Sequence, residues 1–165
     1  MTLSDPVARV WSAFLSQTSR PLDTPVYDVF SFGDREALAN DLGALVCAGA
    51  KVATASLLWE YPPEGKGPPK QGDLSVVTDW SGAPLCVIET TSVEVRAFED
   101  VEEGFAAAEG EGDLTLAWWR DAHWAYFGRA CERLGRERSV GMPVVCERFR
   151  VVYRPESPRQ VGGGG

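Results

Sequence analysis

The chain has 165 residues, of which 44% are hydrophobic and 24% are charged, and its formal net charge is −8. This composition fits one soluble globular domain with a true core. No apolar run reaches the roughly 18 residues that a membrane span needs, and the N-terminus lacks the basic and apolar regions of a secretory signal. The acidic balance excludes a long footprint on duplex nucleic acid, because such binding relies on neutralising phosphates. We therefore expect a cytoplasmic protein that binds no membrane and no long duplex.

The first part of the chain predicts two helices. Residues 5–17 begin with an aspartate cap and Pro6 at the first helical position, and apolar residues follow at helical spacing. A turn-rich segment leads to a second helix, for which Asp34 is a candidate cap and Gly49 a plausible C-terminal stop. We expect this helical N-terminal part to span residues 5–48.

The middle and the end of the chain predict strands. Residues 50–60, the segment "LSVVTDW" and the segment "APLCVIETTSVEVRAF" have strand character, and "MPVVCERFRVVYR" ends the fold as a strand from Pro143 to Arg154. The stretch 62–73 holds four prolines and three glycines, so it predicts a surface loop, and loops of that length are often functional.

Between these strands lies a predicted helical insertion, residues 99–135. The acidic run "EDVEEGFAAAEGEGD" predicts a short helix and a loop with a solvated acidic face, and its spacing matches no calcium loop. The aromatic-rich segment that follows, residues 113–135, has the strongest helical periodicity of the chain.

Together these elements predict an α+β fold: a small antiparallel β-barrel flanked by N-terminal helices and an inserted aromatic-rich helix. We expect one domain over residues 1–154, with barrel strands within 50–98 and 143–154, and a disordered tail over 155–165. The four cysteines are widely spread, which argues against a zinc site and favours free thiols. We expect no metal site and no cofactor.

Glu89 is the first candidate for chemistry. Strand alternation places it on one face with Val87, Thr91, Val93 and Val95. An unpaired, ionised carboxylate on an apolar face costs several kcal/mol, on the order of the penalty for a buried ion. Glu89 is therefore paired, protonated or open to a wet cleft. A salt bridge to an arginine, or a change of face at a bulge, explains it equally well.

Lys51 is the natural partner of Glu89, at the junction between the second helix and the first predicted strand. Thr54 follows three residues later, and the two side chains converge only if residues 51–54 form a turn or bulge. A lysine in a dry cleft can act as a base, a nucleophile or an anion holder. An exposed lysine at a strand end is the alternative.

His123 is the only histidine, and it lies within the predicted aromatic helix. A lone histidine in such a stripe is more often a hydrogen-bonded core residue than a catalytic base. Aromatic residues beside the Pro/Gly loop can stack on a base or anchor the loop. The residues that we expect to contact a substrate are Ser56, Trp59, Tyr61, Asp79 and Trp80.

The motif "GAKVATAS", the segment "GDLSVVTDWSGAPLCVIETTSVEV" and the strand "MPVVCERFRVVY" occur in this order. Together they resemble the ASCH domain, a PUA-like barrel family. The "VFSFGD" and "LAWWRDAHWAYF" segments are similar to its helical branch of predicted RNA-binding proteins. The resemblance covers about residues 27–153.

This resemblance implies a barrel with a cleft that holds the lysine of the K-x-x-T motif. Some small members are amidohydrolases that deacylate N4-acetylcytidine with a lysine, a threonine and a glutamate, which correspond here to Lys51, Thr54 and Glu89. Others are metal-dependent ribonucleases on single-stranded RNA. This chain differs from the small members by its extra helices.

Three functions follow as expectations. The first is a hydrolase on a modified, N4-acylcytidine-like nucleoside, with Thr54 as nucleophile, Lys51 as its base and Glu89 as the group that orients the lysine or shuttles a proton. The second is a ribonuclease on short single-stranded RNA, for which a divalent metal becomes possible. The third is a non-catalytic module that binds RNA or a nucleotide. The oligomeric state is not predicted.

Overall fold

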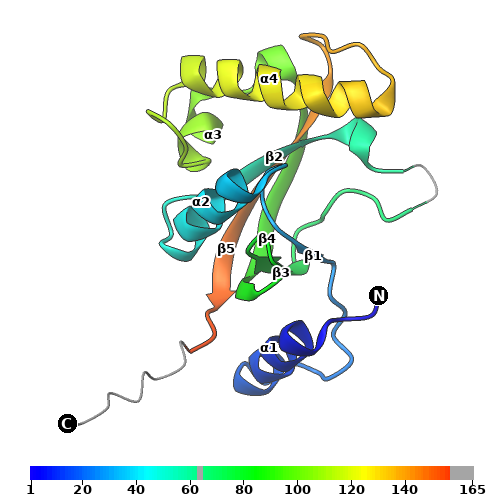
Figure 1. Cartoon of the computed structure of the whole chain (residues 1–165), viewed down its shortest axis with the longest axis vertical. Coiled ribbons are helices and arrows are strands. Elements are labelled where there is room, and N and C mark those ends of the chain that lie inside the picture. Colours follow the sequence, from blue (N-terminus) through cyan, green and yellow to red (C-terminus); the bar gives the residue numbers. More distant parts are fainter. Residues whose placement is uncertain (63–64, 157–165) are drawn as a thin grey trace.

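The computed structural model describes residues 1–62 and 65–156, which form a five-stranded sheet with helices on both of its faces (Figure 1). The strand order is β1-β3-β4-β5-β2. The strands are β1 (Asp28–Phe30), β2 (Ala53–Leu57), β3 (Leu74–Thr78), β4 (Pro84–Ala97) and β5 (Pro143–Tyr153). The helices are α1 (Asp5–Gln17), α2 (Glu36–Cys47), α3 (Glu103–Ala108) and α4 (Leu116–Leu134).

The long strands β4 and β5 form the centre of a curled half-barrel. They pair antiparallel over most of their length, and the register shifts between Val87 and Ile88 and again between Thr90 and Ser92. Such irregularities bend a strand and increase its twist. The α+β class and the barrel-like sheet are therefore confirmed. One pair, β1 with β3, is parallel, and the sequence did not predict β1.

Three apolar clusters fill the space between the sheet and its helices. Helix α1 packs on Val76 and Val87, whereas α2 packs near Val77 on the opposite face, because neighbouring residues of a strand alternate. Helices α3 and α4 cover the β2 end of the sheet. Figure 1 shows α4 across one end of the molecule and α1 at the other.

The helices begin and end close to their predicted boundaries, but the predicted N-terminal cap of α2 is wrong. Arg35 occupies the N-cap position without a side-chain cap. Asp34 instead accepts a hydrogen bond from Arg129 Nε of α4 at 2.7 Å, which lowers the pKa of this carboxyl group. Gly49 follows the end of α2 with φ of 78°, as its role of helix stop requires.

The four cysteines are free thiols, as predicted. Burial raises the pKa of Cys86 and of Cys146 to about 12, so both are unreactive. No described helix has the length and apolar character to cross a membrane. The predicted disordered tail falls mostly on residues 157–165, and the predicted 62–73 loop includes 63–64; both stretches lie outside the described residues.

Candidate active site

A cavity of about 300 Å³ lies where the start of β2 meets α2, the α3–α4 connection and α4. Its walls mix aromatic and charged side chains. The lining residues that matter for chemistry and recognition are Phe32, Arg35, Lys51, Thr54, Glu109, Glu111, Trp118, His123, Tyr126 and Arg129.

Lys51 is the charged centre of this cavity, with 2% of its surface exposed. Its Nζ donates to the backbone oxygen of Ala53 at 2.7 Å, to Glu111 Oε2 at 3.1 Å and to the backbone oxygen of Glu109 at 3.4 Å. Glu109 Oε1 lies 3.8 Å from the same nitrogen. Three N–H donors thus have three acceptors, which is the arrangement of an ammonium ion.

The local backbone explains why this lysine is buried. After α2 ends, the backbone nitrogens of Ala50 and Lys51 donate to the oxygen of Leu45 at 2.9 and 3.1 Å. The nitrogen of Val52 then donates to the oxygen of Ala108 at the end of α3, at 2.9 Å. These bonds turn Lys51 inward, just before β2 begins, and join its segment to the acidic run.

Two glycines bring the acidic run against Lys51. Gly110 has φ of 69°, and a Cβ at this position would collide with the backbone oxygen of Ala50. Gly112 has φ of 60°, and a Cβ there would collide with the ring of Trp118. Glycine alone tolerates both the left-handed conformation and the close approach. The E-G-E-G spacing therefore presents two carboxylates to one ammonium.

Glu109 is the most deeply held of these carboxylates, with 1% of its surface exposed. Its Oε2 accepts from Trp119 Nε1 at 2.6 Å and lies 2.9 Å from His123 Nε2. Burial by itself raises the pKa of Glu109, but Lys51, His123 and Trp119 outweigh it and lower the pKa to about 2. Glu109 is therefore ionised at any ordinary pH.

The pKa of Glu111 is shifted in the opposite direction, upward. Burial raises its pKa above the usual 4.5, and the charge of Glu109 adds to this effect, although Lys51 opposes both. Two neighbouring carboxylates whose pKa values are driven apart are a common arrangement for acid–base chemistry. Glu111 is thus the carboxylate of this pair that is suited to exchange a proton.

The expectation of a solvated acidic face is wrong for Glu109 and Glu111, which both contact Lys51. Sequence spacing alone did not identify them, although the glycines between the carboxylates were a usable signal for a tight turn. His123 is buried and hydrogen bonded, as predicted, since its Nδ1 lies 2.9 Å from the backbone oxygen of Trp119. Its pairing with Glu109 was not foreseen.

Among the described residues, Glu109, Glu111 and His123 offer ligand atoms that lie within 4.8 Å of one another. This set does not fit a resident divalent ion, because the buried ammonium of Lys51 already supplies the positive charge between the carboxylates. The Nε2 atom of His123 is also engaged by Glu109. We therefore derive no step through a metal.

Thr54 reaches the same cavity from β2. Lys51 lies just before the strand and Thr54 lies within it. Both residues line the cavity, while their joint role as a K-x-x-T pair stays a prediction. Across the sheet, Thr54 is opposite Glu147 of β5. Burial raises the pKa of Glu147 to about 7, although its Oε2 accepts from Thr90 Oγ1 at 2.7 Å.

Glu89 does not line this cavity. Its carboxylate pairs with Arg20 at 3.4 Å and with Arg150 at 3.3 Å. Glu89 shares a face with Val87, as predicted, but this is the face that α1 covers, whereas the cavity lies on the side of α2. The expected Lys51–Glu89 pairing is wrong, and a catalytic role for Glu89 stays a prediction that no contact with Lys51 supports.

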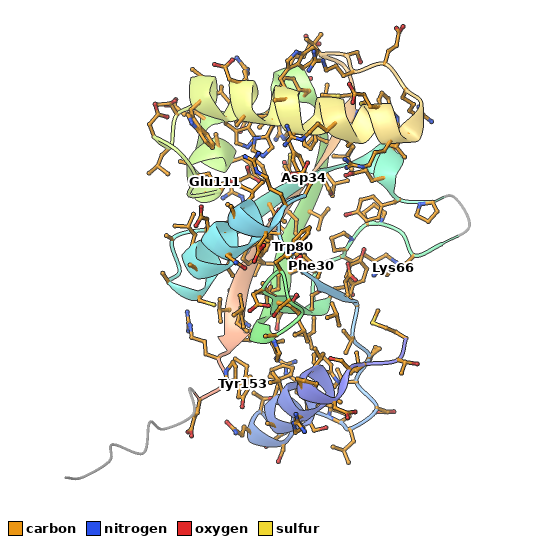
Figure 2. All side chains as sticks on the ribbon, in the orientation of Figure 1. Phe30, Asp34, Lys66, Trp80, Glu111 and Tyr153 are labelled. Atoms are coloured by element: carbon orange, nitrogen blue, oxygen red, sulfur yellow. The ribbon has the colours of Figure 1, made fainter. Side chains whose placement is uncertain are left out.

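None of the five residues expected to bind substrate lines this cavity. Ser56 Oγ and Tyr61 Oη are 3.0 Å apart, and the ring of Trp59 lies 4.5 Å from the guanidinium of Arg136. Asp79 and Trp80 line a separate hollow beside the N-terminus. Figure 2 shows Trp80 well away from Glu111. Their contact with a substrate remains a prediction.

Comparison with protein families matches residues 28–153 to the ASCH domain. The chain belongs to the ASCH domain family. The ASCH domain of Lactobacillus crispatus JV V101 is 38% identical, with a TM-score of 0.86 over 93% of this chain and 98% of that one. Protein EF3133 of Enterococcus faecalis V583 is 33% identical, with a TM-score of 0.82 over 93% of this chain and 96% of that one. No curated protein matches the chain. ASCH domains have a PUA-like fold that is often proposed to bind RNA.

Proposed function

We propose that this ASCH domain is a hydrolase that removes an acyl group from a modified nucleoside of the N4-acylcytidine type. The observation that carries the proposal is that one small cavity gathers the hydroxyl of Thr54, the carboxylate of Glu111 and the ammonium of Lys51. A nucleophile, a proton acceptor and a fixed positive charge are the parts that acyl transfer needs.

The size and walls of the cavity favour a nucleoside over a longer RNA. Its volume of about 300 Å³ is at the lower end of small-molecule sites. Phe32, Trp118 and Tyr126 offer aromatic surface against which a base can stack. The net charge of −8 also opposes a long phosphate track.

In the proposed reaction, Thr54 Oγ attacks the acyl carbon while the Glu111 carboxylate takes the hydroxyl proton. The bond between that carbon and the amide nitrogen breaks, and Glu111 gives the proton to the leaving amine. Water then attacks the threonyl ester. Glu111 takes a proton from this water and returns it to Thr54, so one water is consumed for each acid and amine released.

Lys51 has a different role in this scheme from the one that the sequence suggested. Its three N–H bonds already point at oxygen atoms, so we assign the base role to Glu111 rather than to Lys51. The ammonium orients Glu111 and balances the charge of the pair. A lysine that stays charged is a fixed point charge of this kind.

The test is incubation of the purified chain with a series of N4-acylcytidines, followed by chromatographic separation of cytidine and acid. We expect release of cytidine by wild type and a loss of at least about 100-fold in kcat for Thr54→Val and for Glu111→Gln. Glu94→Gln is the matched control, because Glu94 is exposed and lies outside the cavity.

The two alternatives give different results in the same experiment. A ribonuclease would cleave a labelled single-stranded oligoribonucleotide, with or without added divalent metal, and leave acylcytidines intact. A binding module would hold an acylcytidine or oligonucleotide in a calorimetric titration without forming any product. Either outcome would contradict the proposed hydrolase.

A further inference from the structure

The only histidine of the chain lines the proposed reaction cavity, where its Nε2 pairs with Glu109. We infer that His123 and Trp119 of α4 are positioning residues that hold Glu109 as the fixed counter-charge of Lys51, and that His123 does so as a doubly protonated imidazolium. Their effect on turnover rests on the proposed hydrolase function. The charge state of His123 does not.

The hydrogen bonds of the His123 ring require a proton on both of its nitrogens. His123 Nδ1 lies 2.9 Å from the backbone oxygen of Trp119, and a carbonyl oxygen can only accept. Nε2 lies 2.9 Å from Oε2 of Glu109, which also accepts from Trp119 Nε1, while Oε1 of this carboxylate lies 3.8 Å from the ammonium of Lys51, so Glu109 is held as an anion. A neutral imidazole has one N–H and would leave a nitrogen lone pair against an oxygen lone pair. Only the imidazolium satisfies both contacts.

The charges of the neighbouring side chains also favour a positively charged His123. Lys51 and His123 would supply two positive charges, and Glu109 and Glu111 two negative ones, within one buried group of contacts. Removing the charge of His123 would leave a net negative charge with little access to water, which is strongly unfavourable. The cluster of these four side chains is therefore neutral with the imidazolium and unbalanced without it.

Trp119 supports the same arrangement from two sides. Its indole N–H donates to Glu109 Oε2 at 2.6 Å. Its ring also stacks on the imidazole of His123, with centroids 4.2 Å apart and planes 16° apart. An aromatic face stabilises a cation placed over it. Trp119 thereby fixes both the carboxylate and the ring that pairs with it.

This arrangement excludes His123 as a general base, since both of its nitrogens act as donors. It also separates the tasks of the two carboxylates. Glu109, held by three neighbours, anchors the ammonium of Lys51, while Glu111 is left to exchange protons. Through Trp119 and His123, helix α4 thus positions the charged residues of the site.

The test is nitrogen-15 NMR of the imidazole, whose signals need no assignment because there is one histidine. We expect both ring nitrogens of wild type at pH 7 to have the similar shifts of an imidazolium, and the exposed Glu94→Gln, outside the cluster, to retain them. Glu109→Gln should convert the ring to a neutral tautomer with widely separated shifts. A neutral tautomer in wild type at pH 7 would overturn the inference, and that spectrum requires no variant to fold.

A kinetic measurement tests the positioning role. We expect His123→Gln to lower kcat for acylcytidine by about tenfold or more with little change in KM, because a misplaced reacting group slows the chemical step. An unchanged kcat would refute the positioning role. If wild type releases no cytidine, the proposed function fails, while the NMR spectrum still decides the charge state of His123.

Discussion

Lys51 and Glu111 are 60 residues apart in the sequence, yet Lys51 Nζ donates to Glu111 Oε2 at 3.1 Å inside the cavity. The contact joins the segment before β2 to the connection between α3 and α4. It exists because the acidic run turns at two glycines and is tied to the Lys51 segment by a backbone hydrogen bond. The charge pair therefore depends on the backbone as much as on the two side chains.

Replacing Gly110 should damage both stability and the site. In Gly110→Ala, the new Cβ collides with the backbone of Ala50 and the left-handed conformation is strained, so Glu109 and Glu111 must move. We expect a loss of about 2 kcal/mol or more of unfolding free energy, measured by urea denaturation. Gly104→Ala is the control, because it lies in α3 with no atom near its Cβ. Equal stability of the two variants would contradict this explanation.

Removing the charge of Glu109 should be the most destabilising of the carboxylate changes. Glu109→Gln leaves the ammonium of Lys51 without its deepest counter-charge, and breaking a buried pair costs about 3–5 kcal/mol. Thermal and urea unfolding measure this. Exposed Glu94→Gln should change stability by less than about 0.5 kcal/mol. A loss below about 1 kcal/mol for Glu109→Gln would mean that water reaches this cluster.

Glu147 should make the protein less stable as pH rises. Burial raises its pKa from 4.5 to about 7, so between these values the folded state binds more protons than the unfolded state. The contribution is fully present below about pH 4.5 and is lost by about pH 7. Its size is about 3 kcal/mol from the pKa difference.

The measurement compares wild type with Glu147→Gln by urea denaturation at several pH values from 4 to 8. The glutamine cannot ionise, and its side-chain oxygen can still accept from Thr90. We expect the variant to gain stability relative to wild type as the pH increases. Parallel curves for the two proteins would show that Glu147 does not titrate in this range.

Turnover should depend on the ionisation of Glu111. Its pKa is raised by burial, and the proposed base is the carboxylate. We therefore expect kcat/KM to fall as the pH drops through a value above 4.5, with the inflection absent from the residual activity of Glu111→Gln. A flat profile between pH 5 and 8, with full activity, would assign the base role elsewhere.

The replacement Glu89→Gln tests whether this residue is catalytic, as the sequence suggests, or structural, as its arginine contacts indicate. Because Glu89 pairs with Arg20 and Arg150 outside the cavity, we expect stability to fall by about 1 kcal/mol and acylcytidine turnover to stay near wild type. Thermal unfolding and initial rates measure the two effects. Loss of turnover at unchanged stability would restore Glu89 as a catalytic residue.

Periodicity and turn residues were sufficient to determine much of this protein: the α+β class, the limits of α1 and α4, and the long β4. These features depend on local backbone preferences and on apolar patterns that repeat within one element. The prediction that Glu89 faces Lys51 failed because helices cover both faces of the sheet. Glu89 shares the α1 face with its cross-strand partner Leu74, whereas the cavity lies on the side of α2, and alternation alone does not tell which face holds a site.

Only the tertiary structure decided which carboxylates meet the buried lysine. Glu109, Glu111 and His123 come from a connection and a helix that reach Lys51 through chain folding over about sixty residues, and no local pattern encodes that contact. The sequence by itself placed Lys51 at the start of a strand and Thr54 three residues later, but it did not decide that both line one cavity. Long-range packing determined that their acidic partners come from the helical insertion, because only there do two left-handed glycines let the backbone approach Ala50 and Trp118 closely enough.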